Sequence, residues 1–287
     1  SHLEISLDGY EENDFALILG FPGTTRRNLT AARVREIAEI ENTNRIRIRK
    51  LALEIIEEDM LADNRVRIQY TAKHSALSNY YKYSIGQNRS ISLLKVEERR
   101  REVEEKFMDW ISGDTLLLNK YQDVIRIMQD MIAERKEMEN ALSYLEEIFL
   151  LQKAVEIFGF AASALPIYFK ELGYGSEDQS REVLINKMKE EAREFFRNFN
   201  PGTDQKIAGK LISKYASQVE PIYFPGFFST LNRKFGNDID KYLGHLYKKS
   251  VFADPDRFKK FISKPKHRKL IKDPAFMGAA PHGRPLN

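Results

Sequence analysis

Apolar side chains recur at intervals of three and four residues over most of the chain, and this spacing limits the possible folds more than any other feature. Ile48, Leu51, Ala52, Ile55 and Ile56 follow it within RIRIRKLALEIIEEDML. The opening residues of that segment alternate as a strand would, but the continuation has the helical period and is rich in Leu and Glu, which favour helix. We therefore predict a helix here.

The same spacing predicts helices along the rest of the chain. In the first half these are a helix capped by Asn28 or Thr30, a helix over about 71–85 that ends at Gly86, a long charged helix carrying Leu93 to Trp110 that stops near Gly113, one carrying Leu117 to Ile132, and one carrying Met138 to Val155. In the second half they lie near 178–198, 203–218, 237–249 and 255–262. Short linkers between long amphipathic helices predict antiparallel neighbours.

The two ends of the chain differ from this pattern. LEISL alternates apolar and polar residues, DGYEEND carries turn residues, and FALILG is a short apolar run, so residues 1–25 predict two strands joined by a loop. The stretch AFMGAAPHGRPLN at the other end has no periodicity. The expected organisation is a short β segment at 1–25, a mainly α domain of long antiparallel amphipathic helices at 26–273, and a loose tail at 274–287.

Composition excludes several classes of site. Without cysteine the chain has no disulfide, thiolate metal site or cysteine nucleophile. The five histidines are far apart and form no H-x-x-x-H pair, so no metal site or cofactor is expected. Net charge is only +4, and the basic segments RIRIRK and KPKHRK are interpreted as solvated helix faces. We therefore expect no nucleic-acid partner.

The most apolar region, 144–169, does not predict a membrane span. Four charged residues interrupt it, and its longest run without charge, 157–169, is 13 residues, whereas a span needs about 20. The chain also begins without a basic and apolar leader, so no signal peptide is expected within it.

Two sequence motifs that would indicate a catalytic site are absent. The turn GFPGTTRR has glycines three apart and no following lysine, and Pro22 removes a backbone donor, so it does not fit a phosphate loop. No G-x-S-x-G turn occurs. We therefore predict no catalytic residue within the chain.

The aromatic segment SNYYKYSIG is the remaining candidate site. On a helix, Asn79 and Tyr83 share one face, because they are four residues apart, while Tyr80 and Tyr81 point elsewhere. Tyrosines beside an amide occur both in cores and in ligand pockets. From the residues alone, packing is the favoured interpretation.

Longer segments carry a family resemblance. GFPGTTRRNLT, then NRIRIRKLALEIIEEDMLADNRVRIQYTAKHSALSNYYKYSIGQNRS, LLKVEERRREVEEKF and NDIDKYLGHLYKKSVFADPDRFKKFISKP resemble the bacterial dipeptidyl-peptidase 7 and 11 family. These are chymotrypsin-like serine exopeptidases. The likeness runs in order over most of 14–276.

The resemblance implies an architecture and an activity. In that family a double β-barrel holds a His-Asp-Ser triad, and a helical domain inserted between the barrel halves covers the cleft. Residues 14–23 then correspond to the last strand of the first half and its exit turn, and the rest to the helical cap. The family's His and Asp would lie upstream and its Ser downstream. We therefore expect this chain to be inactive by itself, although it resembles part of a dipeptidyl aminopeptidase that needs no cofactor.

One residue role follows from the resemblance. The family's asparagine in an ANYW or ANYY segment helps to hold the α-ammonium group of the substrate, and Asn79 in SNYYK occupies that position. The chain departs from the family at Ser78 and Tyr81, where Ala and Trp are frequent. Asn79 is thus the predicted substrate-binding residue.

The resemblance also implies partners and a compartment. The partners are peptides with a free N-terminus, the missing barrel halves and a second copy in a homodimer, and the parent protein would be periplasmic or secreted. The alternative hypothesis is a noncatalytic helical module that binds a partner or nucleic acid through its basic helix faces.

Overall fold

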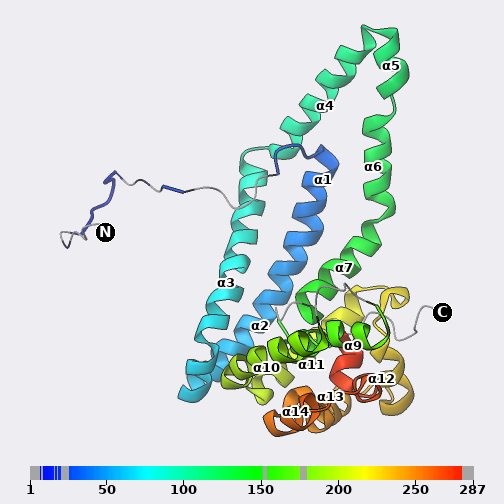
Figure 1. Ribbon diagram of the computed structural model, residues 1–287. Helices are drawn as coiled ribbons and strands as arrows, with labels where there is room; N and C mark the ends of the chain where they lie inside the picture. Colours follow the sequence, from blue (N-terminus) through cyan, green and yellow to red (C-terminus); the bar gives the residue numbers. More distant parts are fainter. Residues whose placement is uncertain are drawn as a thin grey trace.

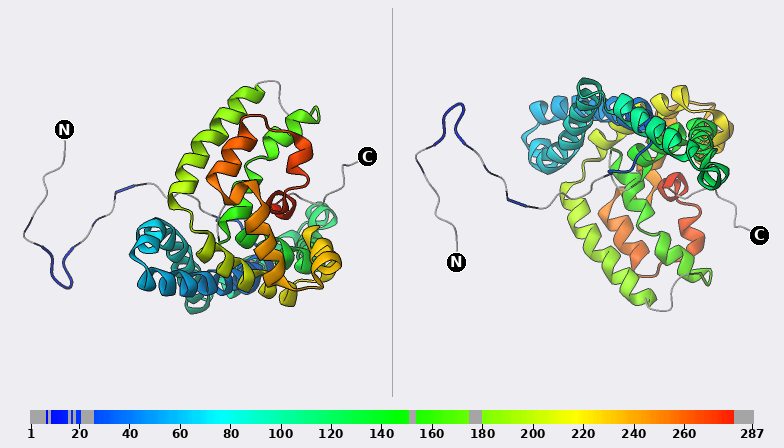
Figure 2. Two further views of the ribbon diagram at one scale, coloured as in Figure 1. Left: turned by 90° about the horizontal axis from the view of Figure 1, so that it is seen from below. Right: turned by 90° about the horizontal axis from the view of Figure 1, so that it is seen from above.

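The computed structural model describes residues 7, 9–15, 17, 19–20, 26–150, 154–174 and 180–279. Figure 1 shows two parts, an elongated arm formed by the helices up to residue 149 and a compact lobe formed by the helices from residue 156 onward. The views along the arm in Figure 2 show the arm helices gathered along one side of the lobe. The predicted mainly α fold is confirmed.

The arm begins as one continuous helix and then folds back on itself. Its elements are α1 (Ala31–Glu36), the π-helix η1 (Ile37–Asn42), α2 (Thr43–Ala62), α3 (Asn64–Leu93), α4 (Val96–Ser112), α5 (Thr115–Tyr121), α6 (Val124–Glu134) and α7 (Lys136–Phe149). Thr30 caps α1, because its hydroxyl oxygen accepts a hydrogen bond from the Arg33 amide at 3.2 Å. At Asp63 the backbone becomes extended and the side chain accepts from the Arg65 amide at 2.7 Å. This one-residue turn places α2 and α3 side by side and antiparallel.

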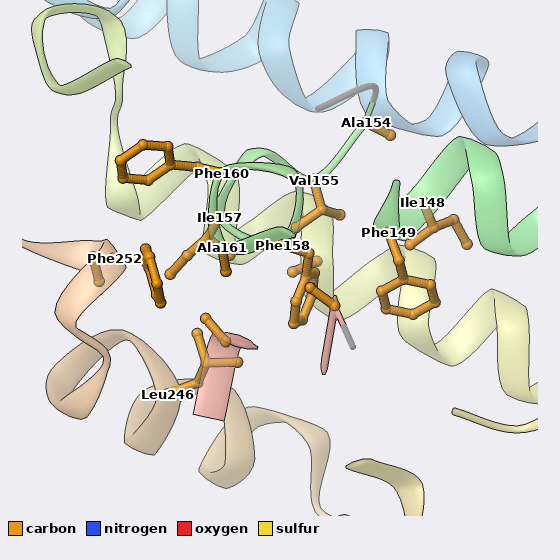
Figure 3. Packing of buried hydrophobic residues seen from close by; sticks show 14 of the residues in the cluster. Ile148, Phe149, Ala154, Val155, Ile157, Phe158, Phe160, Ala161, Leu246 and Phe252 are labelled. Carbon is orange, nitrogen blue, oxygen red and sulfur yellow. The ribbon is translucent and has the colours of Figure 1, made fainter. Parts of the chain in front are cut away.

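The lobe is built from shorter helices. They are α8 (Glu156–Ala162), α9 (Leu165–Glu171), α10 (Arg181–Asn198), α11 (Pro201–Gln218), η2 (Pro221–Tyr223), α12 (Phe227–Phe235), α13 (Ile239–Lys249), η3 (Val251–Ala253), α14 (Pro255–Ile262), α15 (His267–Leu270) and α16 (Pro274–Ala279). Its core is rich in aromatic rings, such as Phe160 and Phe195, which stack with centroids 4.0 Å apart. Figure 3 shows Ile148 and Phe149 of α7 entering this core. The arm and the lobe therefore share one hydrophobic core.

The upper arm is packed differently. The buried residues of α4 are Glu104 and Ile111, and neither α5 nor α6 has any among its described residues. Trp110 and Leu116, near the tip of the arm, are largely exposed. The stability of the arm therefore depends mainly on its lower half, where α2, α3 and α7 meet the lobe.

The predicted end of a helix at Gly86 is wrong, because α3 continues to Leu93. Asn88, two residues beyond Gly86 on the side facing η1, donates a hydrogen bond to the Ala38 carbonyl at 3.0 Å and accepts one from Asn42 at 2.7 Å. These contacts offset the cost of about 1 kcal/mol for glycine inside a helix. The chain turns instead at Lys95, which has a left-handed backbone (φ 47°).

Other predicted boundaries also differ. The helix predicted from Leu117 to Ile132 is two helices, α5 and α6, and the one predicted to continue to Val155 ends at Phe149. The helices predicted near 178–198, 203–218, 237–249 and 255–262 are confirmed as α10, α11, α13 and α14. The predicted loose tail is wrong for residues 274–279, which form α16 and bury Phe276.

The predicted N-terminal β segment stays a prediction. None of the described residues before Ala31 lies in a strand. The remaining positions of 1–25, including 21–25 of the Gly-rich turn, lie outside the described residues, as do residues 280–287 of the predicted tail.

Candidate functional site on helix α3

Asn79 lies in the middle of α3, on the side of the helix that faces away from α2. The buried side of α3 carries Tyr70, Leu77 and Ser84, whereas Asn79 is exposed. Of the described residues, none hydrogen-bonds its side-chain amide. The amide oxygen and its N–H groups are thus free to bind a ligand, as the predicted role requires.

The tyrosines around Asn79 divide between surface and core. Tyr80 and Tyr83 are each about half exposed (55% and 56%) and meet edge to face, with ring centroids 6.3 Å apart. The Gln87 amide donates to the Tyr83 hydroxyl at 3.2 Å, which fixes that ring. Tyr81 packs against the hydrophobic core. The favoured packing interpretation therefore holds for Tyr81, while the other two rings form an aromatic surface next to Asn79.

A buried ion cluster lies behind this surface, between α2, α3 and α7. The Glu147 carboxylate accepts hydrogen bonds from Arg45 Nε at 3.1 Å and from Arg49 Nε at 2.9 Å. Glu147 and Arg49 are 3% and 4% exposed. The interpretation of RIRIRK as a solvated face is therefore wrong for these two arginines. Their shared partner lies about a hundred residues along the chain, so local sequence could not identify it.

A second buried polar cluster joins α3 to the lobe. Asp204 accepts hydrogen bonds from the Glu156 and Ile157 amides at the start of α8 (2.7 and 3.2 Å) and from the Tyr247 hydroxyl at 2.7 Å. Burial raises the pKa of Asp204 to about 6. Lys73 of α3 pairs with Glu156, and burial lowers the pKa of the Lys73 ammonium to about 7. This cluster connects α3 with α8, α11 and α13.

Neither cluster was predicted from the sequence, although the sequence contains a signal for both. Glu147 and Glu156 interrupt the apolar region 144–169. A carboxylate in a buried segment needs a cation or hydrogen-bond donors nearby. Such a pattern indicates a buried pair, but it does not say where in the chain the partner lies.

A cavity of about 450 Å³ lies elsewhere in the arm, between α1, η1, α4, α6 and the start of α7. Its charged lining is Arg35, Glu36, Glu39, Arg101 and Lys136, and alanine and isoleucine side chains provide the rest, together with Gln129. Arg35 and Arg101 both pair with Glu97. Most of the charge on this wall is thus balanced within the protein.

Other functional features are absent from the described ranges. No group of three or more acidic, histidine or cysteine side chains there is placed to hold a metal ion. No serine hydroxyl in the described part of the chain is hydrogen-bonded to a histidine. Every helix in those ranges is too short or too polar to cross a lipid bilayer.

Comparison with known proteins supplies the family. Residues 1–281 match the family described as Peptidase S46. The chain belongs to this peptidase family. The predicted membership is therefore confirmed.

The S46 relatives include named dipeptidyl peptidases. The chain is 33% identical over 280 residues to dipeptidyl-peptidase 7 of Phocaeicola vulgatus, covering 95% of this chain and 37% of that protein. It is 28% identical over 278 residues to the Asp/Glu-specific dipeptidyl-peptidase of Porphyromonas gingivalis, covering 96% of this chain and 38% of that protein. The S46 chain thus spans a little over a third of the length of these relatives.

A solved structure shares the fold of the S46 chain. It is the crystal structure of Porphyromonas endodontalis DPP11 in complex with the dipeptide Arg-Glu, with a TM-score of 0.70 and 24% sequence identity. The match covers 91% of this chain and 36% of that one. At this identity the likeness describes the fold alone.

Proposed function

We propose that these helices form the substrate-capping part of a serine-type dipeptidyl peptidase that removes dipeptides from free peptide N-termini. The match to the peptidase S46 family over residues 1–281 carries this proposal. The reacting Ser, His and Asp are proposed to lie in barrel halves outside these 287 residues. Two observations support this: the chain spans a little over a third of its relatives' length, and it contains no G-x-S-x-G turn.

Asn79 is the proposed ligand of the substrate's N-terminal ammonium group. Its amide oxygen can accept hydrogen bonds from the ammonium, and a neutral amide avoids the cost of enclosing a second charge. The side chain is exposed and has no hydrogen-bond partner among the described residues. The backbone at Asn79 is held in place, because the opposite side of α3 is buried against α2. Holding the amine at a fixed point would determine how many residues reach the nucleophile.

The first test is Asn79→Ala in the full-length protein. The variant loses a hydrogen bond to a charged group, worth about 1.5–3 kcal/mol, so kcat/KM for a fluorogenic dipeptidyl substrate should fall about 10- to 100-fold. The thermal midpoint should not change, since Asn79 makes no buried contact. Asn119→Ala, an exposed asparagine on α5, is the matched control and should leave kcat/KM unchanged.

A second substrate sharpens this test. An N-acetylated version of the same peptide has no ammonium group, so the wild type should cleave it far more slowly. In Asn79→Ala the ratio of rates on the free and acetylated peptides should shrink. An unchanged kcat/KM in Asn79→Ala, or an unchanged ratio, would remove the proposed role.

The same proposal gives the partners and the compartment. The partners are peptides with a free N-terminus, the barrel halves and a second copy of the protein, and the complete enzyme is exported to the periplasm or secreted. Fractionation of the native organism, followed by size measurement of the purified enzyme, tests both. Recovery of the full-length protein in the cytoplasm would contradict the compartment, and a monomer at micromolar concentration would contradict the dimer.

A further inference from the structure

The buried Glu147 carboxylate on α7 joins two arginines that reach α3 on either side of Asn79. Arg49 Nη1 donates to the Leu77 carbonyl oxygen at 3.3 Å, and Arg45 Nη1 donates to the Ser84 hydroxyl oxygen at 3.3 Å. Leu77 and Ser84 are seven residues apart, which is about two helical turns. The segment of α3 that carries Asn79 is therefore held at both its ends.

Arg49 also contacts the aromatic surface beside Asn79. Its guanidinium carbon lies 5.1 Å from the centroid of the Tyr80 ring, within the range of a cation–π interaction. The same group donates to the Ala76 carbonyl oxygen at 3.5 Å. One side chain thus contacts the backbone and the tyrosine that flank Asn79.

Glu147 is itself firmly placed. Its neighbours on α7, Tyr144, Ile148 and Phe149, are buried in the core that the arm and the lobe share. A buried ion cluster adds little to stability compared with apolar residues of similar volume, but removing one member leaves uncompensated charge. Such a cluster can instead specify how two elements are aligned.

We propose that Glu147 is a positioning residue, which sets the rotation of α3 about its axis through Arg45 and Arg49 and so sets where the Asn79 amide lies. This proposal rests on the proposed role of Asn79. A side chain on a helix lies about 6 Å from the axis, so a rotation of about 10° would move the Asn79 amide by about 1 Å. A displacement of this size can lower a rate about a hundredfold.

The test is a double-mutant cycle between Glu147→Gln and Asn79→Ala in the full-length protein. Glu147→Gln keeps the shape of the side chain and removes its charge, and should lower kcat/KM for a dipeptidyl substrate at least about tenfold. In the Asn79→Ala background the same change should have almost no further effect, because the group that it positions is gone. Glu146→Gln, an exposed neighbour on α7, is the matched control and should be silent in both backgrounds.

A second variant separates positioning from folding. Replacing Arg49 and Glu147 together by leucine removes the two most buried charges of the cluster and leaves Arg45, whose side chain is partly exposed. The thermal midpoint should therefore fall less than in Glu147→Gln. The value of kcat/KM should nevertheless stay low. This variant keeps the proposal testable if Glu147→Gln folds poorly.

The outcomes distinguish the two proposals. If Asn79→Ala alone has no effect, the proposed amine site fails. If Asn79→Ala lowers kcat/KM but Glu147→Gln does not, or if the two losses simply multiply, the amine site stands and the positioning role of Glu147 is refuted. Normal kcat/KM in the double leucine variant would refute it as well.

Discussion

Lys73 is an enclosed basic side chain at the point where α3 meets the lobe. Its ammonium pairs with Glu156 and lies 3.6 Å from the centroid of the Tyr70 ring, and the Tyr70 hydroxyl donates to the same carboxylate at 2.8 Å. Burial lowers the pKa of Lys73 to about 7, although the charge of Asp204 opposes this shift. In the unfolded chain this lysine keeps its ordinary pKa of 10.5.

This difference in pKa predicts how stability changes with pH. Between about pH 7 and 10 the unfolded chain binds a proton at Lys73 that the folded chain has released, so the free energy of unfolding should rise with pH. In Lys73→Met this contribution disappears. Thermal midpoints of the 287-residue chain from pH 7 to 9.5 should therefore rise more steeply in the wild type than in Lys73→Met.

The control for this titration is Lys82→Met, which removes an exposed lysine of the same helix. Its midpoints should follow the wild-type slope. Parallel curves for the wild type and Lys73→Met would show that Lys73 stays charged when buried.

At the residue scale, the sequence could predict residues that lie together in one local segment, but not residues that only tertiary packing brings together. Asn79 could be proposed because SNYYK lies in one stretch that resembles a family segment, and its role stays a prediction. Arg45 and Arg49 were assigned to solvent because their carboxylate partner, Glu147, lies on a helix that only tertiary packing brings near. The acceptor role of Asp204 depends in the same way on contacts between α8, α11 and α13.

At the scale of elements, the glycines of α3 and α16 are a contrasting pair. Gly86 lies inside α3, and a Cβ added there would meet no described atom within 4 Å. Gly278 lies in α16, where an added Cβ would come within 2.7 Å of Phe158 Cδ1. Alanine could therefore replace Gly86 without a steric clash. Gly278, in contrast, allows α16 to approach the Phe158 ring closely.

Substitution by alanine should therefore have opposite effects. Gly86→Ala should raise the free energy of unfolding by about 0.5–1 kcal/mol, because alanine favours helix. Gly278→Ala should lower it by about 1–3 kcal/mol, because the added methyl group would overpack the core around Phe158. Urea unfolding of both variants checks this. Destabilisation by Gly86→Ala would show that α3 needs a flexible point there.

Helical periodicity predicted the bodies of the long helices better than their ends. The end of α3 was misplaced because η1, fifty residues away, holds the turn after Gly86. The short helices α12 and α16 were missed because their residues show too few turns for a period to emerge. They are helical because aromatic residues such as Phe227 and Phe276 are buried in the lobe.

At the scale of the molecule, the shared core makes the arm and the lobe one folding unit. Ile48 and Ile56 of α2 belong to the same cluster as Phe160 and Phe252 of the lobe. We expect the 287-residue chain to unfold in one cooperative transition, and the proposed function adds that this chain alone is inert.

The expected lack of peptidase activity in the isolated chain can be measured directly. The purified chain should not hydrolyse fluorogenic dipeptides, because the proposal assigns the nucleophile and its base to other parts of the enzyme. The full-length protein at the same concentration is the positive control. Hydrolysis by the 287-residue chain that persists through purification would contradict this division of labour.

The bend at Gly113 and Asp114, between α4 and α5, lies at the end of the arm farthest from the lobe. Helices α4, α5 and α6, which form this part of the arm, contribute almost nothing to the interior. A fluorophore or a small reporter domain inserted at this bend would leave the packed half of the molecule intact. Because the arm is long, a small tilt of its helices at their base would then produce a measurable displacement of the probe during turnover.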